Sequence, residues 1–214
     1  MKYELRHTSD GSLTVYHPGT GECYRSGHAA RTESEWVFFR PAVLEHPEIS
    51  SASPFRVLEL GYGLGTNFQF LADFHRQSPF RSLEFTSVDQ DLSGAGFFPS
   101  SGEAADFLRA RSFHRAGFQA LLLETTFEDA LRQFPENHFH SVFFDPFSPK
   151  TEPGSWADEI FAATARALRP GGRLATYSVS RRAKDGLRAA GFSWEKTALP
   201  EILHKRNGML AIRL

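Results

Sequence analysis

A glycine-rich turn preceded by an acid is the part of the sequence best suited to binding a ligand. In "LELGYGLGTNF", Glu59 is followed by three glycines at alternate positions, Gly61, Gly63 and Gly65. A glycine lets a ligand lie against the backbone where a side chain would obstruct it, and it also permits positive φ. A helix is predicted to start after the turn, and its N-terminus would point at the ligand. We therefore predict a cofactor-binding turn here.

Three further acids each end an apolar segment that is predicted to be a strand. They are Asp89 in "SLEFTSVD", Glu124 in "FQALLLE" and Asp145 in "FHSVFFD". An acid at the position of Asp89 would accept hydrogen bonds from ribose hydroxyls, of a dinucleotide as well as of other nucleosides, or it could cap a turn. Glu124 is expected near an adenine, although it could simply begin the next helix.

Asp145 is expected beside the reacting group. A carboxylate there suits an amine acceptor, which it would orient and whose proton it could accept; the alternative is a cap on the next helix. Phe147 and Trp156 follow in "FFDPFSPKTEPGSW". They could offer a flat surface for stacking a base, or they could both belong to the core.

The composition limits the class of protein. The chain has 214 residues, of which 41% are hydrophobic, enough for one sizeable core. Its one cysteine, Cys23, cannot form an internal disulfide, and no apolar run is long enough for a membrane span or a signal peptide. We expect a cytoplasmic protein with no membrane partner. His138 and His140 have no third ligand at a recognisable spacing, so no metal site is predicted.

Strand-like and helix-like segments alternate along the chain, which predicts an α/β fold with ligands at the carboxyl ends of parallel strands. Seven strands are expected in a mostly parallel sheet with helices on both faces. A β-hairpin is expected around Asp10-Gly11. Residues 1–50 are interpreted as a hairpin and helix extension packed on a core of residues 51–214. Helices are expected at 32–46, interrupted near Pro41, and at 103–116.

Charge is distributed unevenly along the chain. Residues 1–164 carry 13 Lys and Arg against 22 Asp and Glu, whereas residues 165–214 carry 11 against 3. Clustered cations of this kind can neutralise the phosphates of a nucleic acid, although solvated helix faces would give the same count. The candidate phosphate contacts are Arg181, Arg182, Lys184, Arg188, Lys205 and Arg206.

These motifs together resemble a known family. The turn with its preceding acid is similar to motif I of the class I S-adenosylmethionine methyltransferases, and Asn67 ends that motif. The block from Asp145 through Phe147 to Trp156, with the "RPGGRLATYS" segment after it, resembles the MnmC- and MnmD-type tRNA methyltransferases. Upstream, "CYRSGHAARTESEWVFF" is similar to another segment of that family. The candidate substrate-binding residues that carry over from these segments are Tyr24, Ser26, Glu33 and Trp156.

The resemblance implies a class I methyltransferase fold, S-adenosylmethionine as cofactor and the tRNA anticodon loop as partner. It implies methylation of the exocyclic amine of 5-aminomethyl-2-thiouridine at the wobble position. Because the chain stops at Leu214, we expect the stand-alone form without an FAD-dependent oxidase domain. A separate oxidase or an upstream wobble-modifying enzyme would then be a partner.

The sequence also departs from the family pattern. Arg25 stands where a histidine is usual, and Glu124 only substitutes for the usual Gly-Asp. Two alternatives therefore stay open. One is a methyl- or aminopropyltransferase that acts on a small amine, and the other is a catalytically silent RNA-binding module.

Overall fold

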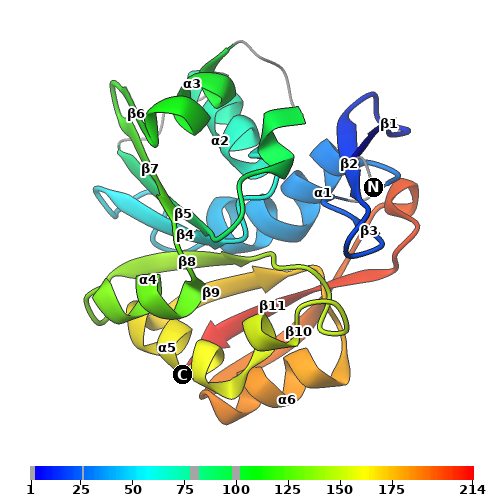
Figure 1. Cartoon of the computed structure of the whole chain (residues 1–214). Helices are drawn as coiled ribbons and strands as arrows, with labels where there is room; N and C mark the ends of the chain where they lie inside the picture. Colours follow the sequence, from blue (N-terminus) through cyan, green and yellow to red (C-terminus); the bar gives the residue numbers. More distant parts are fainter. Residues whose placement is uncertain (1–2, 26, 78–81, 98–101) are drawn as a thin grey trace.

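The computed structural model describes residues 3–25, 27–77, 82–97 and 102–214. Within these residues the larger sheet has eight strands: β4 (Phe55–Leu60), β5 (Leu83–Asp89), β6 (Ser112–Arg115), β7 (Phe118–Glu124), β8 (Phe139–Phe144), β9 (Leu168–Thr176), β10 (Phe192–Ala198) and β11 (Asn207–Arg213). Their order is β10-β11-β9-β8-β4-β5-β7-β6 (Figure 1). The four central pairings, from β9 to β7, are parallel, whereas β6, β10 and β11 pair antiparallel. The predicted α/β fold is confirmed.

Helices cover both faces of this sheet (Figure 1). One face carries α1 (Ala30–Glu33), η1 (Ser34–Leu44), α2 (Thr66–Gln77) and α3 (Glu103–Ala110), and the other carries α4 (Phe127–Gln133), α5 (Asp158–Ala167) and α6 (Arg181–Ala189). Because successive residues of a strand face opposite sides, Val57 belongs to the first buried cluster and Leu58 to the second. Glu59 consequently points to the same side as Val57.

The N-terminal region forms a second sheet of β1 (Glu4–His7), β2 (Leu13–His17) and β3 (Glu22–Cys23). The expected hairpin is therefore present and has a third strand. Its turn is fixed to α1 because the Asp10 carboxylate accepts hydrogen bonds from the backbone and hydroxyl of Thr32, at 3.0 and 2.9 Å. Since η1 shares a buried cluster with β4 and β5, we propose that residues 1–50 are an extension packed on the core rather than a separate folding unit.

Two local predictions differ from the structure. The helix expected at 103–116 ends at Ala110, because Arg111 adopts φ 58° and the chain turns back as β6. This strand pairs with β7 and places Phe113 against Phe118, which adds the eighth strand. The helix expected to be interrupted near Pro41 instead continues through it as η1. Bonds of the i→i+5 type occur there, as from Glu45 N–H to the Arg40 carbonyl at 3.0 Å.

Candidate active site

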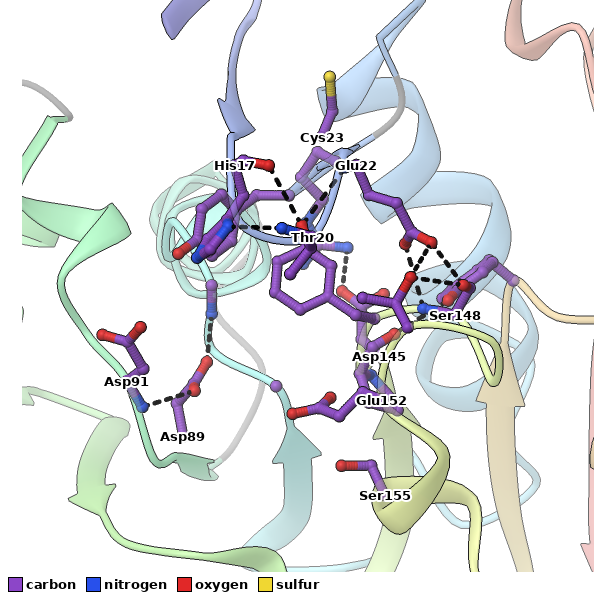
Figure 2. Close-up of a pocket in the computed structure, with 18 of the residues that line it drawn as sticks. His17, Thr20, Glu22, Cys23, Asp89, Asp91, Asp145, Ser148, Glu152 and Ser155 are labelled. Atoms are coloured by element: carbon purple, nitrogen blue, oxygen red, sulfur yellow. Dashed lines mark hydrogen bonds and ion pairs between the residues drawn. The ribbon is translucent and has the colours of Figure 1, made fainter. Parts of the chain in front are cut away.

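A cavity of about 680 Å³ lies at the carboxyl ends of β4, β5 and β8. Its volume is in the range of small-molecule sites, and its position is the one at which open α/β sheets bind ligands. Residues from the N-terminal sheet complete the wall. Figure 2 shows Asp89 and Asp91 on one side of the cavity and Asp145 with Ser148 on the other, with Thr20 and Glu22 above.

The glycine turn lines this cavity through Gly61 and Gly63. Gly61 has φ 106°, and a Cβ there would lie 2.8 Å from the carbonyl carbon of Asp145, so no other residue fits without a shift. Gly63 has φ 54°, and its N–H donates to Asp89 Oδ2 at 2.9 Å. Gly65 has φ 74° but faces the Tyr62 ring rather than the cavity. The turn thus joins β4, β5 and β8 at one point.

Glu59 is fully buried beneath the turn and does not line the cavity. Its carboxylate accepts a hydrogen bond from Asn67 Nδ2 at 2.7 Å and one from Ser87 Oγ at 2.5 Å. Burial raises the pKa of the Glu59 carboxyl to about 7, against the opposing effect of Arg25 and of these hydrogen bonds. The sequence predicts that Glu59 and Asn67 contact the cofactor. In the structure both are buried behind the turn and neither lines the cavity, so their contact with the cofactor stays a prediction.

Asp145 reaches the cavity directly after β8, and its backbone N–H donates to the Leu60 carbonyl at 2.8 Å. It does not cap a helix, since Ala157 is the residue before α5. Its carboxylate contacts Arg25 Nη1, and Arg25 Nη2 lies 3.7 Å from Glu59 Oε1. Burial raises the pKa of the Asp145 carboxyl well above its ordinary value, and Arg25 acts in the opposite direction.

Beside Asp145 lies a group of side chains suited to an amine. Lys205 Nζ is 3.2 Å from Glu33 Oε1 and 4.9 Å from the centre of the Tyr177 ring. The Tyr177 hydroxyl donates to the Pro146 carbonyl at 2.9 Å. A carboxylate and an aromatic face thus hold the ammonium group of Lys205 at this wall of the cavity.

Phe147 lies on the cavity wall in a group of three aromatic rings that contact one another. Its ring centre is 5.1 Å from that of Tyr24 and 5.7 Å from that of His17. Trp156 is completely buried, and its Nε1–H donates to the Phe147 carbonyl at 2.7 Å. The sequence allows Trp156 to be a stacking surface or a core residue, and the structure favours the core. From there its hydrogen bond holds the backbone of Phe147.

Glu22 ties the N-terminal sheet to the loop after β8. Its carboxylate accepts hydrogen bonds from the backbone of Ser148 at 3.2 Å, from the hydroxyl of Ser148 at 2.5 Å and from the hydroxyl of Thr151. Burial acts to raise the pKa of Glu22, but these hydrogen bonds outweigh it and lower the pKa. The loop that carries Phe147 is consequently anchored at Phe147 by Trp156 and at Ser148 and Thr151 by Glu22.

Other predicted residues lie away from the cavity. Glu124 binds Arg111 Nη2 at 2.7 Å and is half exposed. Arg182 donates to the Trp156 carbonyl and to Asp158, each at 2.6 Å, and the side chain of Arg181 is 94% exposed. Arg206 is exposed as well, and none of these four residues lines the cavity. Ser26 lies outside the described residues.

Several wall residues were not predicted from the sequence. Asp91 and Gln90 follow Asp89, and Gln90 Nε2 donates to Glu152 at 3.2 Å. Thr126 and Phe127 line the cavity at the start of α4. Arg25 was noticed only as a departure from the family pattern. For the two acids, Asp91 and Glu152, the sequence offers one signal: Asp91 is close to Asp89, and Glu152 lies in the loop after Asp145.

These features define a class of protein. The glycine turn leaves room against the backbone, Asp89 and Asp91 offer oxygens to ribose hydroxyls, and the acidic wall suits a cation. S-adenosylmethionine suits such a site. Its ribose matches the aspartate oxygens, and its ammonium and sulfonium groups match the acidic wall. The site therefore fits a methyltransferase with this cofactor, which the cavity-lining residues Gly61, Gly63 and Asp89 would hold.

Comparison with known proteins supports this class. A family described as S-adenosyl-L-methionine-dependent methyltransferase matches residues 103–213, and the chain belongs to this family. S-adenosyl-L-methionine is accordingly its cofactor.

Among named relatives, the tRNA 5-methylaminomethyl-2-thiouridine biosynthesis bifunctional protein MnmC of Caulobacter vibrioides is 34% identical over 197 residues, covering 82% of this chain and 33% of the relative. The same protein of Polaromonas sp. is 31% identical, covering 98% and 36%. The chain thus spans about a third of the length of these relatives. The crystal structure of MNMC2 from Aquifex aeolicus is similar with a TM-score of 0.83 and 26% identity, covering 98% of this chain and 70% of that one.

No helix among residues 3–25, 27–77, 82–97 and 102–214 has the length and apolar character needed to cross a membrane. The same residues contain no group of three or more His, Cys, Asp or Glu that could hold a metal ion. His140 Nδ1 accepts a hydrogen bond from the backbone N–H of Arg56 at 2.9 Å, and His140 Nε2 contacts Arg169.

Proposed function

We propose that this chain methylates the exocyclic amine of 5-aminomethyl-(2-thio)uridine at the wobble position of tRNA. The observation that carries the proposal is the buried Asp145 carboxylate on the cavity wall beside the glycine turn, next to Glu33, Lys205 and Tyr177. The relatives named above are tRNA-modifying proteins of this kind. The cytoplasmic location expected from the sequence belongs to the same proposal.

The residues divide the chemistry between them. S-adenosylmethionine, when bound, supplies a methyl group from its sulfonium, and the sulfur becomes a neutral thioether, which is the leaving group. Asp145 orients the attacking nitrogen through an N–H hydrogen bond and stabilises the positive charge that develops on it. Phe147 and Tyr24 offer ring faces to the flipped uridine, because recognition of an unstacked base relies on stacking. The loop ties made by Trp156 and Glu22 keep these rings in place.

Binding of the anticodon loop is assigned to the basic residues outside the cavity. The side chain of Arg181 is 94% exposed and pairs with Asp185 at 3.3 Å, so it can reach a phosphate. Arg182 and Arg206 are further candidates, and Lys205 connects this surface to the cavity. Contacts of this type make binding strongly dependent on salt.

The first experiment measures transfer of labelled methyl from S-adenosylmethionine to tRNA that carries aminomethyl-uridine, followed by nucleoside analysis. Label in methylaminomethyl-uridine is the expected result. Asp145→Ala should abolish turnover and leave cofactor affinity nearly intact, because the residue acts on the acceptor. Asp106→Ala is a matched control, since Asp106 is an exposed acid that pairs with Arg109 and does not line the cavity. Cofactor binding without any label on tRNA would redirect the search to small amines.

A further inference from the structure

Arg25 is a buried cation held between two carboxylates of the candidate active site. Its guanidinium, only 2% exposed, contacts Asp145 on one side and approaches Glu59 to 3.7 Å on the other. The Phe38 ring covers it, with the guanidinium carbon 5.3 Å from the ring centre. Neither terminal nitrogen makes a well-aligned hydrogen bond within the described residues. Arg25 therefore acts on both acids mainly through its charge.

The other charges around this point do not duplicate Arg25. Lys205 is the second cation on the cavity wall near Asp145, and it is already bound to Glu33. Arg25 is thus left to balance both Glu59 and Asp145. Among the described residues, the titratable groups that face this cluster from the surrounding elements are Glu59 on β4, Tyr62 in the glycine turn, Asp89 on β5, Asp145 after β8, Glu33 on α1, Tyr177 after β9 and Lys205 before β11.

The proposed reaction needs two protonation states at once. The amine must be neutral, because its nitrogen lone pair forms the bond to the methyl carbon while the carbon–sulfur electron pair leaves with sulfur. A primary alkylamine in water is almost entirely ammonium near neutral pH, as a lysine is. Asp145 must also be ionised to stabilise the positive charge that develops on the nitrogen and, after transfer, to attract the proton that the new ammonium releases.

We propose that Arg25 is a positioning residue that keeps Asp145 ionised and disfavours the ammonium form of the bound acceptor. A cation in contact with Asp145 stands within a few ångströms of any amine that this carboxylate binds. It repels the ammonium form and attracts the carboxylate, and both effects favour the reactive pair. This inference rests on the proposed function, since it assigns a role within the same site.

The test is the pH dependence of kcat at saturating tRNA and cofactor for wild type, Arg25→Gln and Arg25→Lys. Loss of the charge in Arg25→Gln should move the rising limb of kcat about 1 to 2 pH units upward, so that activity recovers as pH increases. Arg25→Lys keeps the charge and should keep the limb close to the wild-type position. The matched control is Arg40→Gln, since Arg40 likewise lies over an aromatic ring and pairs with an acid, Glu35, but outside the cavity.

Cofactor affinity and thermal unfolding of each variant separate this role from a purely structural one. A loss of kcat that is equal at every pH, with the limb unmoved, would overturn the inference. A limb shifted as far in Arg25→Lys as in Arg25→Gln would overturn it too, and Arg25→Lys serves as the test if Arg25→Gln does not fold. Failure of the wild type to methylate tRNA at any pH would instead count against the proposed function.

Discussion

Replacing Glu59 by glutamine should change how stability depends on pH. The Glu59 carboxyl is fully buried, and its pKa is raised from 4.5 to about 7. Between these two values the folded chain retains a proton that the unfolded chain has released. The free energy of unfolding therefore decreases as pH rises from about 4.5 to 7, because the folded state then has to ionise a buried group.

The size of the effect follows from the pKa difference. At 1.36 kcal/mol per pKa unit, Glu59 removes about 3 kcal/mol of stability in the wild type by pH 8. Glutamine cannot ionise, and it preserves the local contacts. The glutamine oxygen can accept the hydrogen bond from Asn67. In the wild type the Ser87 hydroxyl donates to Glu59, and in the variant the glutamine amide can instead donate to Ser87 Oγ. Glu59→Gln should thus match the wild type near pH 5 and exceed its stability by up to about 3 kcal/mol at pH 8.

Urea unfolding at pH 5, 6, 7 and 8 measures this difference. Burial lowers the pKa values of His46 and His140 to about 4, so their effect on stability has the opposite sign between about pH 4 and 6.5. Subtracting the two unfolding curves removes that contribution, because both proteins carry the histidines. Glu84→Gln is the control, since Glu84 pairs with Arg56 at a partly exposed site. A difference that does not vary with pH, or a variant less stable at pH 8, would refute the reasoning.

Two other substitutions test the turn and the loop. Gly61→Ala should destabilise the fold by at least about 2 kcal/mol and sharply weaken cofactor binding, because a Cβ at φ 106° would meet the Asp145 carbonyl. Urea unfolding measures the stability and calorimetric titration measures the cofactor affinity. An unchanged cofactor affinity would contradict the assignment of the turn. Trp156→Phe removes the bond to the Phe147 carbonyl at the cost of about 1 to 3 kcal/mol. It should raise KM for tRNA more than Kd for the cofactor, and an unaltered KM would show that Phe147 does not depend on this bond.

The fold was largely predictable because its signals are local. Residues 55–60 and 139–144 are apolar runs of strand length, and the amphipathic pattern of 66–77 has the helical period. For residues 112–115 the sequence predicts the end of a helix, whereas the structure has the strand β6. These residues form a strand because they pair with β7 and because Phe113 packs against Phe118. Neither contact can be predicted from the residues of this segment alone.

The sequence by itself determined which acids follow strands and where the glycine turn lies, because parallel strands bring their carboxyl ends to one edge of the sheet. It therefore determined the presence of the site, with Asp89 and Asp145 on its wall. Only the tertiary structure decided that Glu59 and Trp156 are buried behind that wall, that Glu124 pairs with Arg111 outside it, and that Arg25 joins Glu59 to Asp145. These roles depend on contacts between residues far apart in the chain, and spacing along the sequence carries no information about such contacts.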